Sequence, residues 1–137
     1  MRTLKHYPKI DPTRPLIIIV IDDDDAVRDS TRILLEASGF VVRDHASAES
    51  FLASRCEGAF LLLVDHHMPG MTGAELLEML HAKLGKVPAL MLTGRDDPTI
   101  EARCSRIGVK LVRKPIAEDH LLGSIQETCL ACALSIT

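Results

Sequence analysis

The sequence lacks any hydrophobic run long enough to cross a membrane and any strong excess of one charge. A membrane-spanning helix needs about 20 consecutive apolar residues, whereas the longest apolar runs here, such as residues 16–21, are far shorter. No hydrophobic segment precedes Leu16, so we expect no secretory signal and a cytoplasmic location. The formal net charge of −3 gives no electrostatic support for binding nucleic acid. We therefore expect neither a membrane nor a nucleic acid as a partner.

Cysteines are few, and only Cys129 and Cys132 have the spacing of half a zinc site. A structural zinc site takes four ligands, and no second Cys or His pair has matching spacing. Redox-active pairs with this spacing lie at the start of a helix that follows a strand, which is not the context here. We interpret both cysteines as small apolar residues on a helix.

The length and composition fit one globular domain. The chain has 137 residues, of which 47% are hydrophobic and 26% charged, and this is enough to bury a substantial core. Residues 1–15 contain three prolines and little apolar material, so we expect an extended N-terminal lead-in. Residues 16–137 then form the domain.

From Leu16 onward, short apolar runs alternate with amphipathic segments. We expect strands over residues 16–21, 40–43, 59–64, 88–93 and 109–113. We expect helices over residues 25–38, 47–54, 72–84 and 98–107, and from residue 117 onward. Asp25 and Ser47 are the expected caps of the first two helices. Strict alternation of strand and helix predicts an α/β fold, a parallel sheet with helices on both faces.

Polar residues follow these expected strands directly. Four acids, Asp22 to Asp25, come directly after the first expected strand, and Asp65 comes directly after the third. Crowded carboxylates raise one another's pKa unless a cation compensates, and hard divalent cations such as Mg²⁺ prefer oxygen ligands. Ligands bind beyond the carboxyl ends of parallel strands. We therefore predict a site at that edge, where Asp22, Asp23, Asp65, Thr93 and Lys114 would meet; Asp24 and Asp25 instead serve the positive end of the first helix.

Four motifs, in order, resemble the receiver domain of two-component response regulators over about residues 16–136. They are the acids after the first strand, and segments 65–73, 92–94 and 113–115 after the third, fourth and fifth strands. Segments 22–30 and 46–52 resemble receivers fused to helix-turn-helix transcription domains. The resemblance implies a flavodoxin-like, doubly wound fold whose five parallel strands have the order 2-1-3-4-5.

The resemblance also implies a phosphorylation site. Asp65 would be the phosphoacceptor, and Asp22, Asp23 and Asp65 would hold Mg²⁺ together with the backbone carbonyl of His67. Asp23 would bind the metal directly and Asp22 largely through water. The donor would be a phosphohistidine on a histidine kinase or phosphotransfer protein.

Three further residues would complete the switch. Thr93 would supply the switch hydroxyl, Lys114 would bind the phosphoryl group, and the Lys114–Pro115 peptide would be cis. Phosphorylation would change the surface formed by segments 98–107 and 109–113 and by the last helix, and that surface would control an output partner, an output domain or a homodimer. The chain would be a phosphoacceptor with at most slow self-dephosphorylation, not an enzyme acting on a metabolite.

Two positions could tune this switch and one departs from the family pattern. His67 and Arg95 occupy places that influence the lifetime of the phosphoryl group in receivers. They either govern water access to Asp65 or are plain solvated loop residues. Leu111 occupies a switch position that is usually aromatic, so the usual coupling between threonine and ring is in doubt. His66 and His67 are adjacent loop residues expected to point apart, so we expect no metal ligation by their rings.

Two other functions fit parts of the sequence. In a phosphatase of the haloacid dehalogenase type, Asp22 and Asp24 would form the Asp-x-Asp motif, but Asp65 would be left unexplained. An interaction module that keeps the fold without phosphorylation is the other alternative, although none of the acids or the lysine is lost. The last helix carries no charge after Glu127. Its uniformly apolar end predicts an interface with a second copy, a partner or a neighbouring domain.

Overall fold

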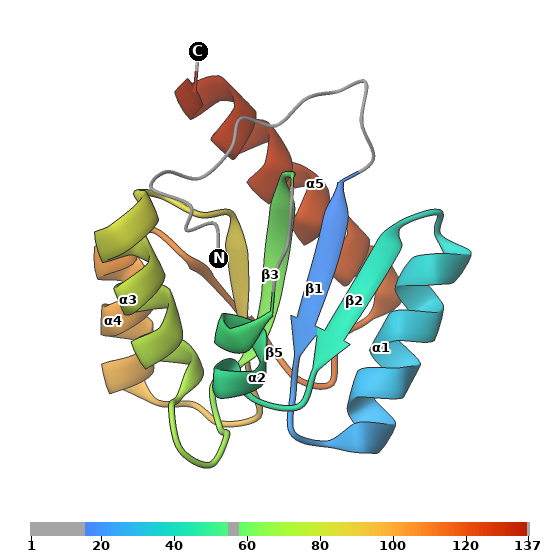
Figure 1. Cartoon of the computed structure of the whole chain (residues 1–137), viewed down its shortest axis with the longest axis horizontal. Coiled ribbons are helices and arrows are strands. Elements are labelled where there is room, and N and C mark those ends of the chain that lie inside the picture. Colours follow the sequence, from blue (N-terminus) through green and yellow to red (C-terminus); the bar gives the residue numbers. More distant parts are fainter. Residues whose placement is uncertain (1–15, 55–57, 137) are drawn as a thin grey trace.

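A computed structural model describes residues 16–54 and 58–136, with the side chains of residues 130–136 left undescribed (Figure 1). The strands are β1 (Ile17–Ile21), β2 (Val41–His45), β3 (Phe60–Asp65), β4 (Ala89–Thr93) and β5 (Lys110–Arg113). The helices are α1 (Asp25–Ala37), α2 (Ala48–Ala53), α3 (Gly73–Leu84), α4 (Pro98–Ile107) and α5 (Glu118–Ile136). The expected lead-in, residues 1–15, lies outside the described residues and stays a prediction.

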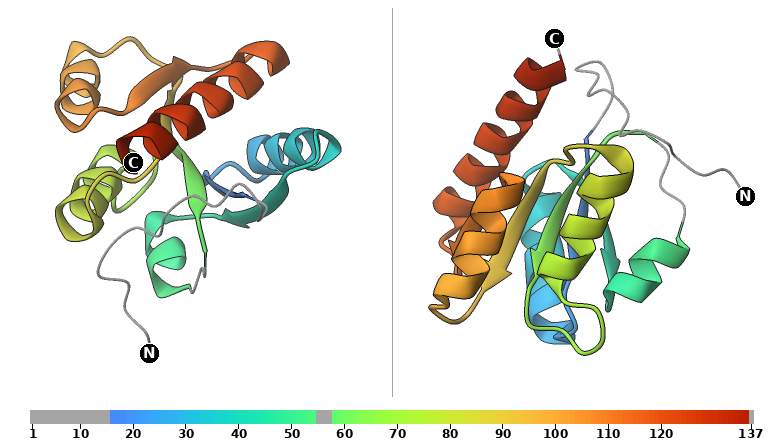
Figure 2. Two further views of the ribbon diagram at one scale, coloured as in Figure 1. Left: turned by 90° about the horizontal axis from the view of Figure 1, so that it is seen from above. Right: turned by 90° about the vertical axis from the view of Figure 1, so that its left-hand side faces the viewer.

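The strands form one parallel sheet in the order β2-β1-β3-β4-β5, which confirms the predicted topology. Helices α1 and α5 cover one face, and α2, α3 and α4 cover the other (Figure 2). The strand order reverses between β1 and β3, where the chain crosses from one half of the sheet to the other. In open sheets of this kind, that reversal creates a crevice at the carboxyl ends of the strands.

Alternate residues of the central strands pack into two separate hydrophobic cores, one on each face of the sheet. Ile19 and Ile21 of β1 pack with residues of α2, α3 and α4, whereas Ile18 and Val20 pack with residues of α1 and α5. All residues of β3 and β4 are buried. Each large aliphatic side chain removed from water contributes roughly 1.5–3 kcal/mol, so the uninterrupted apolar runs place these strands at the centre of the sheet.

The register of the strands brings the polar residues to one edge. Ile21 pairs with Val64, so Asp22 and Asp65 follow at neighbouring ends. Thr93 pairs with Arg113, and the Lys114 N–H donates to the Thr93 carbonyl at 2.8 Å. The carboxyl ends of β1, β3, β4 and β5 therefore present their polar residues to the same space.

Two boundary predictions are wrong. Asp24, not Asp25, caps α1: its carboxylate accepts from the Val27 N–H at 3.1 Å, because the residue before the first helical turn has the extended backbone that a cap needs. Strand β2 runs to His45, beyond the predicted end at residue 43, because its ladder with β1 continues to Ile21. An edge strand tolerates polar side chains on its open face, so its end carries no hydrophobic signal.

The other helix ends agree with their signals. Ser47 caps α2, and Thr72 and Glu75 form a reciprocal capping box at the start of α3. Helix α4 begins at Pro98 and ends at Ile107, and it is followed by Gly108, whose positive φ of 70° favours glycine.

Helix α5 is 19 residues long and extends past the amino ends of the strands (Figure 1). Leu121 and Ile125 are buried against the sheet, while Leu122 and Cys129 are partly buried. Leu121 and Ile125 therefore form the part of α5 that is most deeply buried in the core. The side chains of Cys132 and of the apolar turns after Cys129 lie outside the described set. Within the described residues, none of the helices combines the length and the hydrophobicity needed to cross a membrane.

Candidate functional site

Three carboxylates converge at the carboxyl ends of β1 and β3. One oxygen of each of Asp22, Asp23 and Asp65 lies within 4.8 Å of the others. Asp22 and Asp65 are only 1% and 5% exposed, whereas Asp23 is exposed. Among the described residues this is the cluster of potential metal ligands.

Lys114 reaches this cluster from the end of β5. Its Nζ donates to Asp22 Oδ2 at 2.8 Å and lies 3.5 Å from Asp65 Oδ1. Burial lowers the pKa of Lys114, but the hydrogen bond to Asp22 and the charge of Asp65 outweigh it and leave the pKa above its ordinary value. The ammonium therefore stays charged beside both acids. The Lys114–Pro115 peptide is cis, as expected.

Asp65 has a raised pKa. Burial is the largest cause, and the neighbouring charge of Asp22 adds to it, while Lys114 and the backbone N–H of His67 act in the opposite direction. The carboxylate form of Asp65 is thus less well stabilised in this pocket than in water. A cation arriving at the cluster would relieve that imbalance.

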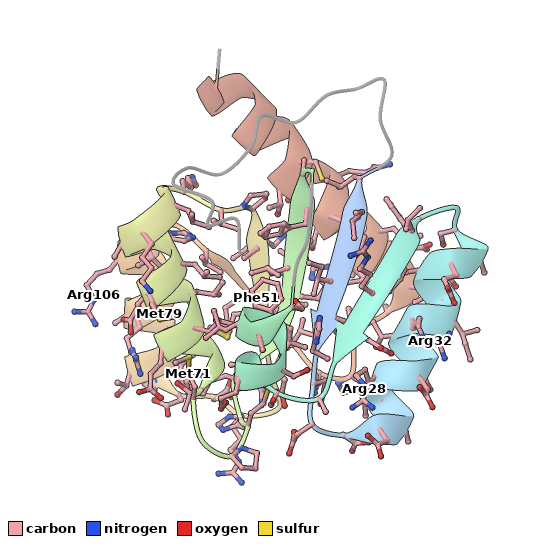
Figure 3. All side chains as sticks on the ribbon, in the orientation of Figure 1. Arg28, Arg32, Phe51, Met71, Met79 and Arg106 are labelled. Atoms are coloured by element: carbon pink, nitrogen blue, oxygen red, sulfur yellow. The ribbon has the colours of Figure 1, made fainter. Side chains whose placement is uncertain are left out.

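Asp22 is held on several sides. Its Oδ1 accepts from the Asp24 N–H at 3.0 Å, and its carbonyl accepts from Arg28 Nη1 at 2.8 Å. Arg28 also pairs with Asp25, and Arg28 and Arg32 both reach Asp44 on β2, so these arginines fasten α1 to the sheet edge (Figure 3). The network fixes the turn from which Asp22 and Asp23 project.

Thr93 lies at the end of β4 and is 2% exposed. Its hydroxyl accepts from the Arg95 N–H at 3.2 Å and donates to the Arg95 carbonyl at 3.1 Å. The side chain of Arg95 is exposed, so Arg95 contacts the threonine through its backbone. The hydroxyl also lies 3.2 Å from His67 Nε2, a contact that the sequence did not predict.

The two histidines after Asp65 do not point apart, contrary to expectation. Their rings pack edge to face, with centroids 5.0 Å apart and an interplanar angle of 81°. His66 is buried, and its Nδ1 accepts from the Ala74 N–H at 3.4 Å. Burial, then the neighbouring His67 and Arg103, lower the pKa of His66. Loop conformation sets such contacts, and adjacency in sequence does not reveal it.

Sequence reasoning also missed the role of Gly73. A Cβ on this residue would lie 2.7 Å from the Asp65 carbonyl and 2.7 Å from Met91 Sδ. The start of α3 therefore approaches the end of β3 too closely for any side chain. The glycine lies within the 65–73 motif, but the sequence pattern does not show how closely the helix approaches the strand.

Leu111, the expected switch position, lies on β5 and is half-buried. It pairs with Met91 in the sheet and packs against the core on the side of α3 and α4. Beside it, Arg113 forms an ion pair of 2.5 Å with Asp96, which follows Arg95 in the β4–α4 loop. The structure thus brings Asp22, Asp23, Asp65 and Lys114 together, with Thr93 and His67 in contact beside them.

Comparison with known proteins identifies similar chains. A family model described as the response regulator receiver domain matches residues 18–126. The transcriptional regulatory protein FixJ of Bradyrhizobium diazoefficiens is 37% identical over 111 residues, which are 80% of this chain and 54% of FixJ. The chain therefore spans about half the length of that relative.

Solved structures agree with the observed topology. A CheY-like receiver domain protein from Methanospirillum hungatei superimposes with a TM-score of 0.81 at 31% identity, covering 89% of this chain and 99% of that one. The response regulator StyR gives a TM-score of 0.81 at 33% identity, covering 89% of this chain and 63% of StyR.

Proposed function

Because this chain belongs to the response regulator receiver domains of two-component signalling, we propose that it is a switch set by phosphorylation of Asp65. The donor is a phosphohistidine on a histidine kinase or a phosphotransfer protein. The observation that carries the proposal is the convergence of Asp65 with Asp22, Asp23 and Lys114 at one edge of the sheet. Residues 16–137 act as one domain in this proposal, in the cytoplasm.

The transfer forms one bond and breaks one. A carboxylate oxygen of Asp65 attacks the phosphorus, the phosphorus–nitrogen bond breaks, and the imidazole leaves with the bonding electron pair and takes up a proton. The product on Asp65 is an acyl phosphate. Lys114, already 3.5 Å from Asp65, offers a compact cation to the oxygens of the transferred group.

The donor set fits Mg²⁺, since three carboxylates gather in a partly buried cluster and hard cations prefer oxygen ligands. Asp22, Asp23 and Asp65 would hold the ion with the backbone carbonyl of His67, Asp22 acting largely through water. When bound, Mg²⁺ neutralises negative charge on the phosphoryl oxygens. Asp22 keeps Lys114 in place by the 2.8 Å contact between the two side chains.

Thr93 and the surface of α4, β5 and α5 change in response to the phosphoryl group. The Thr93 hydroxyl donates to a phosphoryl oxygen, and the β4–α4 loop moves with it. Leu111 lies on β5 beneath this surface, so the response passes through aliphatic packing instead of an aromatic ring. The output is a partner, a second copy or a domain joined to this one. FixJ, a transcriptional regulatory protein, extends well beyond the matched segment.

The proposal is tested by incubating the protein with Mg²⁺ and a small phosphodonor and measuring the intact mass. The wild type should gain one phosphoryl group, and Asp65→Asn should gain none. Asp24→Asn is the matched control: asparagine caps a helix as well as aspartate does, so this variant should be modified like the wild type.

The site of modification separates the alternatives. Trapping the acyl phosphate on Asp65 supports the switch, whereas trapping it on Asp22 would indicate the phosphatase. A wild type that gains no mass under these conditions would favour the interaction module. The lifetime of the phosphoryl group on Asp65, measured in His67 and Arg95 variants, would show whether these residues control the access of water to it. In the wild type we expect slow self-dephosphorylation.

A further inference from the structure

We propose that the His67 side chain holds the Thr93 hydroxyl in its resting position and thereby opposes the turn of Thr93 toward a phosphoryl group on Asp65. The proposal rests on the function proposed above. His67 is a positioning residue here, since it acts through Thr93 and not on the reacting atoms. The observation behind it is the 3.2 Å contact between His67 Nε2 and Thr93 Oγ1.

The Thr93 hydroxyl bonds to the backbone of Arg95, and His67 Nε2 lies within hydrogen-bond distance as a third partner. A hydroxyl has one proton to donate and two lone pairs that accept. The Arg95 N–H fills one lone pair, and the Arg95 carbonyl lies 3.1 Å away as an acceptor. If His67 Nε2 carries its proton, it fills the second lone pair. If it does not, it competes for the hydroxyl proton. In either tautomer, the acceptor of the Thr93 proton is the Arg95 carbonyl or His67 Nε2 and not Asp65.

The position of the His67 ring is fixed from its other side. Its ring packs edge to face on His66, and His66 is buried with Nδ1 accepting from the Ala74 N–H. Ala74 lies in the first turn of α3. The His67 ring therefore lies between the buried His66 ring and the Thr93 hydroxyl, although His67 itself is exposed.

Release of this contact is part of the switching step. To donate to a phosphoryl oxygen, the Thr93 hydroxyl must give up the position shared with His67. A ligand shifts an equilibrium only by its differential interaction with two states, and His67 favours the resting state. The contacts of Thr93 with Arg95 involve the backbone atoms of Arg95, so substituting the His67 side chain leaves them in place.

The experiment uses beryllium trifluoride with Mg²⁺ as a probe that mimics a phosphoryl group on Asp65. Binding is measured by isothermal titration calorimetry, because the chain has no tryptophan to report it. His67→Ala should bind the probe about fivefold more tightly than the wild type, the effect expected for one neutral side-chain hydrogen bond. His67→Gln keeps a polar group near the position of Nε2 and should restore binding close to the wild-type affinity.

Thr93→Val supplies the decisive background because it removes the hydroxyl and keeps the side-chain shape. There, His67→Ala should change the affinity by less than about twofold. An equal fivefold effect with and without the hydroxyl would overturn the proposal, as would weaker or unchanged binding by His67→Ala alone. His120→Ala, another exposed histidine, should bind like the wild type.

The two proposals fail differently. If the wild type binds no beryllium trifluoride, and Asp65→Asn behaves identically, then the phosphorylation proposal itself fails. If the wild type binds and Asp65→Asn does not, but the His67 effect is absent, only the role of His67 is wrong. The substitutions leave the His67 backbone carbonyl in place, so a metal ligand is not lost with the side chain.

Discussion

Single residues at the sheet edge divide into those that a strand end predicts and those that only three-dimensional packing reveals. Asp22, Asp65, Thr93 and Lys114 lie at or directly after the ends of parallel strands, so their convergence could be predicted from the pattern alone. The contact between His67 and Thr93 joins the β3–α3 loop to the end of β4, and the conformation of that loop depends on neighbours distant in sequence. No periodic signal encodes such a contact.

Gly73 offers a prediction at this scale. Replacing it with alanine would place a Cβ 2.7 Å from the Asp65 carbonyl, so β3 and α3 must separate. We expect the free energy of unfolding to fall by about 1–3 kcal/mol and phosphorylation of Asp65 to slow. Urea unfolding and the rate of mass gain measure the two effects.

Gly123 provides the control, since a Cβ there would meet nothing within 4 Å and the residue lies within α5. Gly123→Ala should raise stability by up to about 1 kcal/mol through helix propensity. If Gly73→Ala proved as stable as the wild type and reacted at the same rate, the close approach would have no consequence.

At the scale of elements, capping residues and glycines allowed most helix ends to be predicted. The end of the edge strand β2 could not be predicted, because its polar residues give no hydrophobic signal.

One contact between elements could not be predicted from the sequence. Arg103 of α4 donates to both carboxylate oxygens of Glu78 on α3, from Nε at 3.2 Å and from Nη2 at 2.5 Å. This bidentate pair joins α4, part of the proposed output surface, to its neighbour.

We predict that the Glu78–Arg103 pair contributes about 0.5 kcal/mol at neutral pH, a value reduced for the partial exposure of both side chains. The hydrogen bond from Arg103 lowers the pKa of Glu78. The contribution is therefore fully present above the ordinary pKa of glutamate and is lost as the pH falls through the lower folded-state pKa. A double-mutant cycle with Glu78→Gln and Arg103→Gln, measured by urea unfolding, isolates it. Coupling that persisted in strong acid would contradict this prediction.

For the molecule as a whole, strand-helix alternation predicted the α/β class, and the family resemblance supplied the strand order. The strand order could not be predicted from periodicity, because a repeating pattern indicates whether each segment is a strand or a helix and not which strand it pairs with. Periodicity also does not show how far α5 extends past the sheet or that Leu121 is more deeply buried than Leu122. Both depend on how that helix lies against β4 and β5. The gathering of acids at one edge has a consequence for global stability.

Asp65→Asn should stabilise the metal-free protein by about 1 kcal/mol at neutral pH. Burial and the charge of Asp22 raise the pKa of Asp65. A carboxyl group with a raised folded-state pKa is favourable below its ordinary pKa, and that advantage is lost as the pH rises through the folded-state value. The gain from asparagine should therefore shrink as the pH is lowered. Urea unfolding with a chelator measures it.

Asp23→Asn is the matched comparison, because Asp23 belongs to the same cluster but is exposed. Its substitution should change the free energy of unfolding less. Equal effects of the two substitutions, or a loss of stability in Asp65→Asn, would show that burial of Asp65 does not destabilise the folded protein.

The ion pair between Arg113 and Asp96 adds a sensitivity to the medium. Both side chains are more than half exposed, so dissolved ions screen their attraction over a Debye length of about 10 Å at 0.1 M salt. The pair links the β4–α4 loop to β5, and this link weakens as ionic strength rises. Salt concentration thereby has a direct influence on how firmly the β4–α4 loop is held to β5.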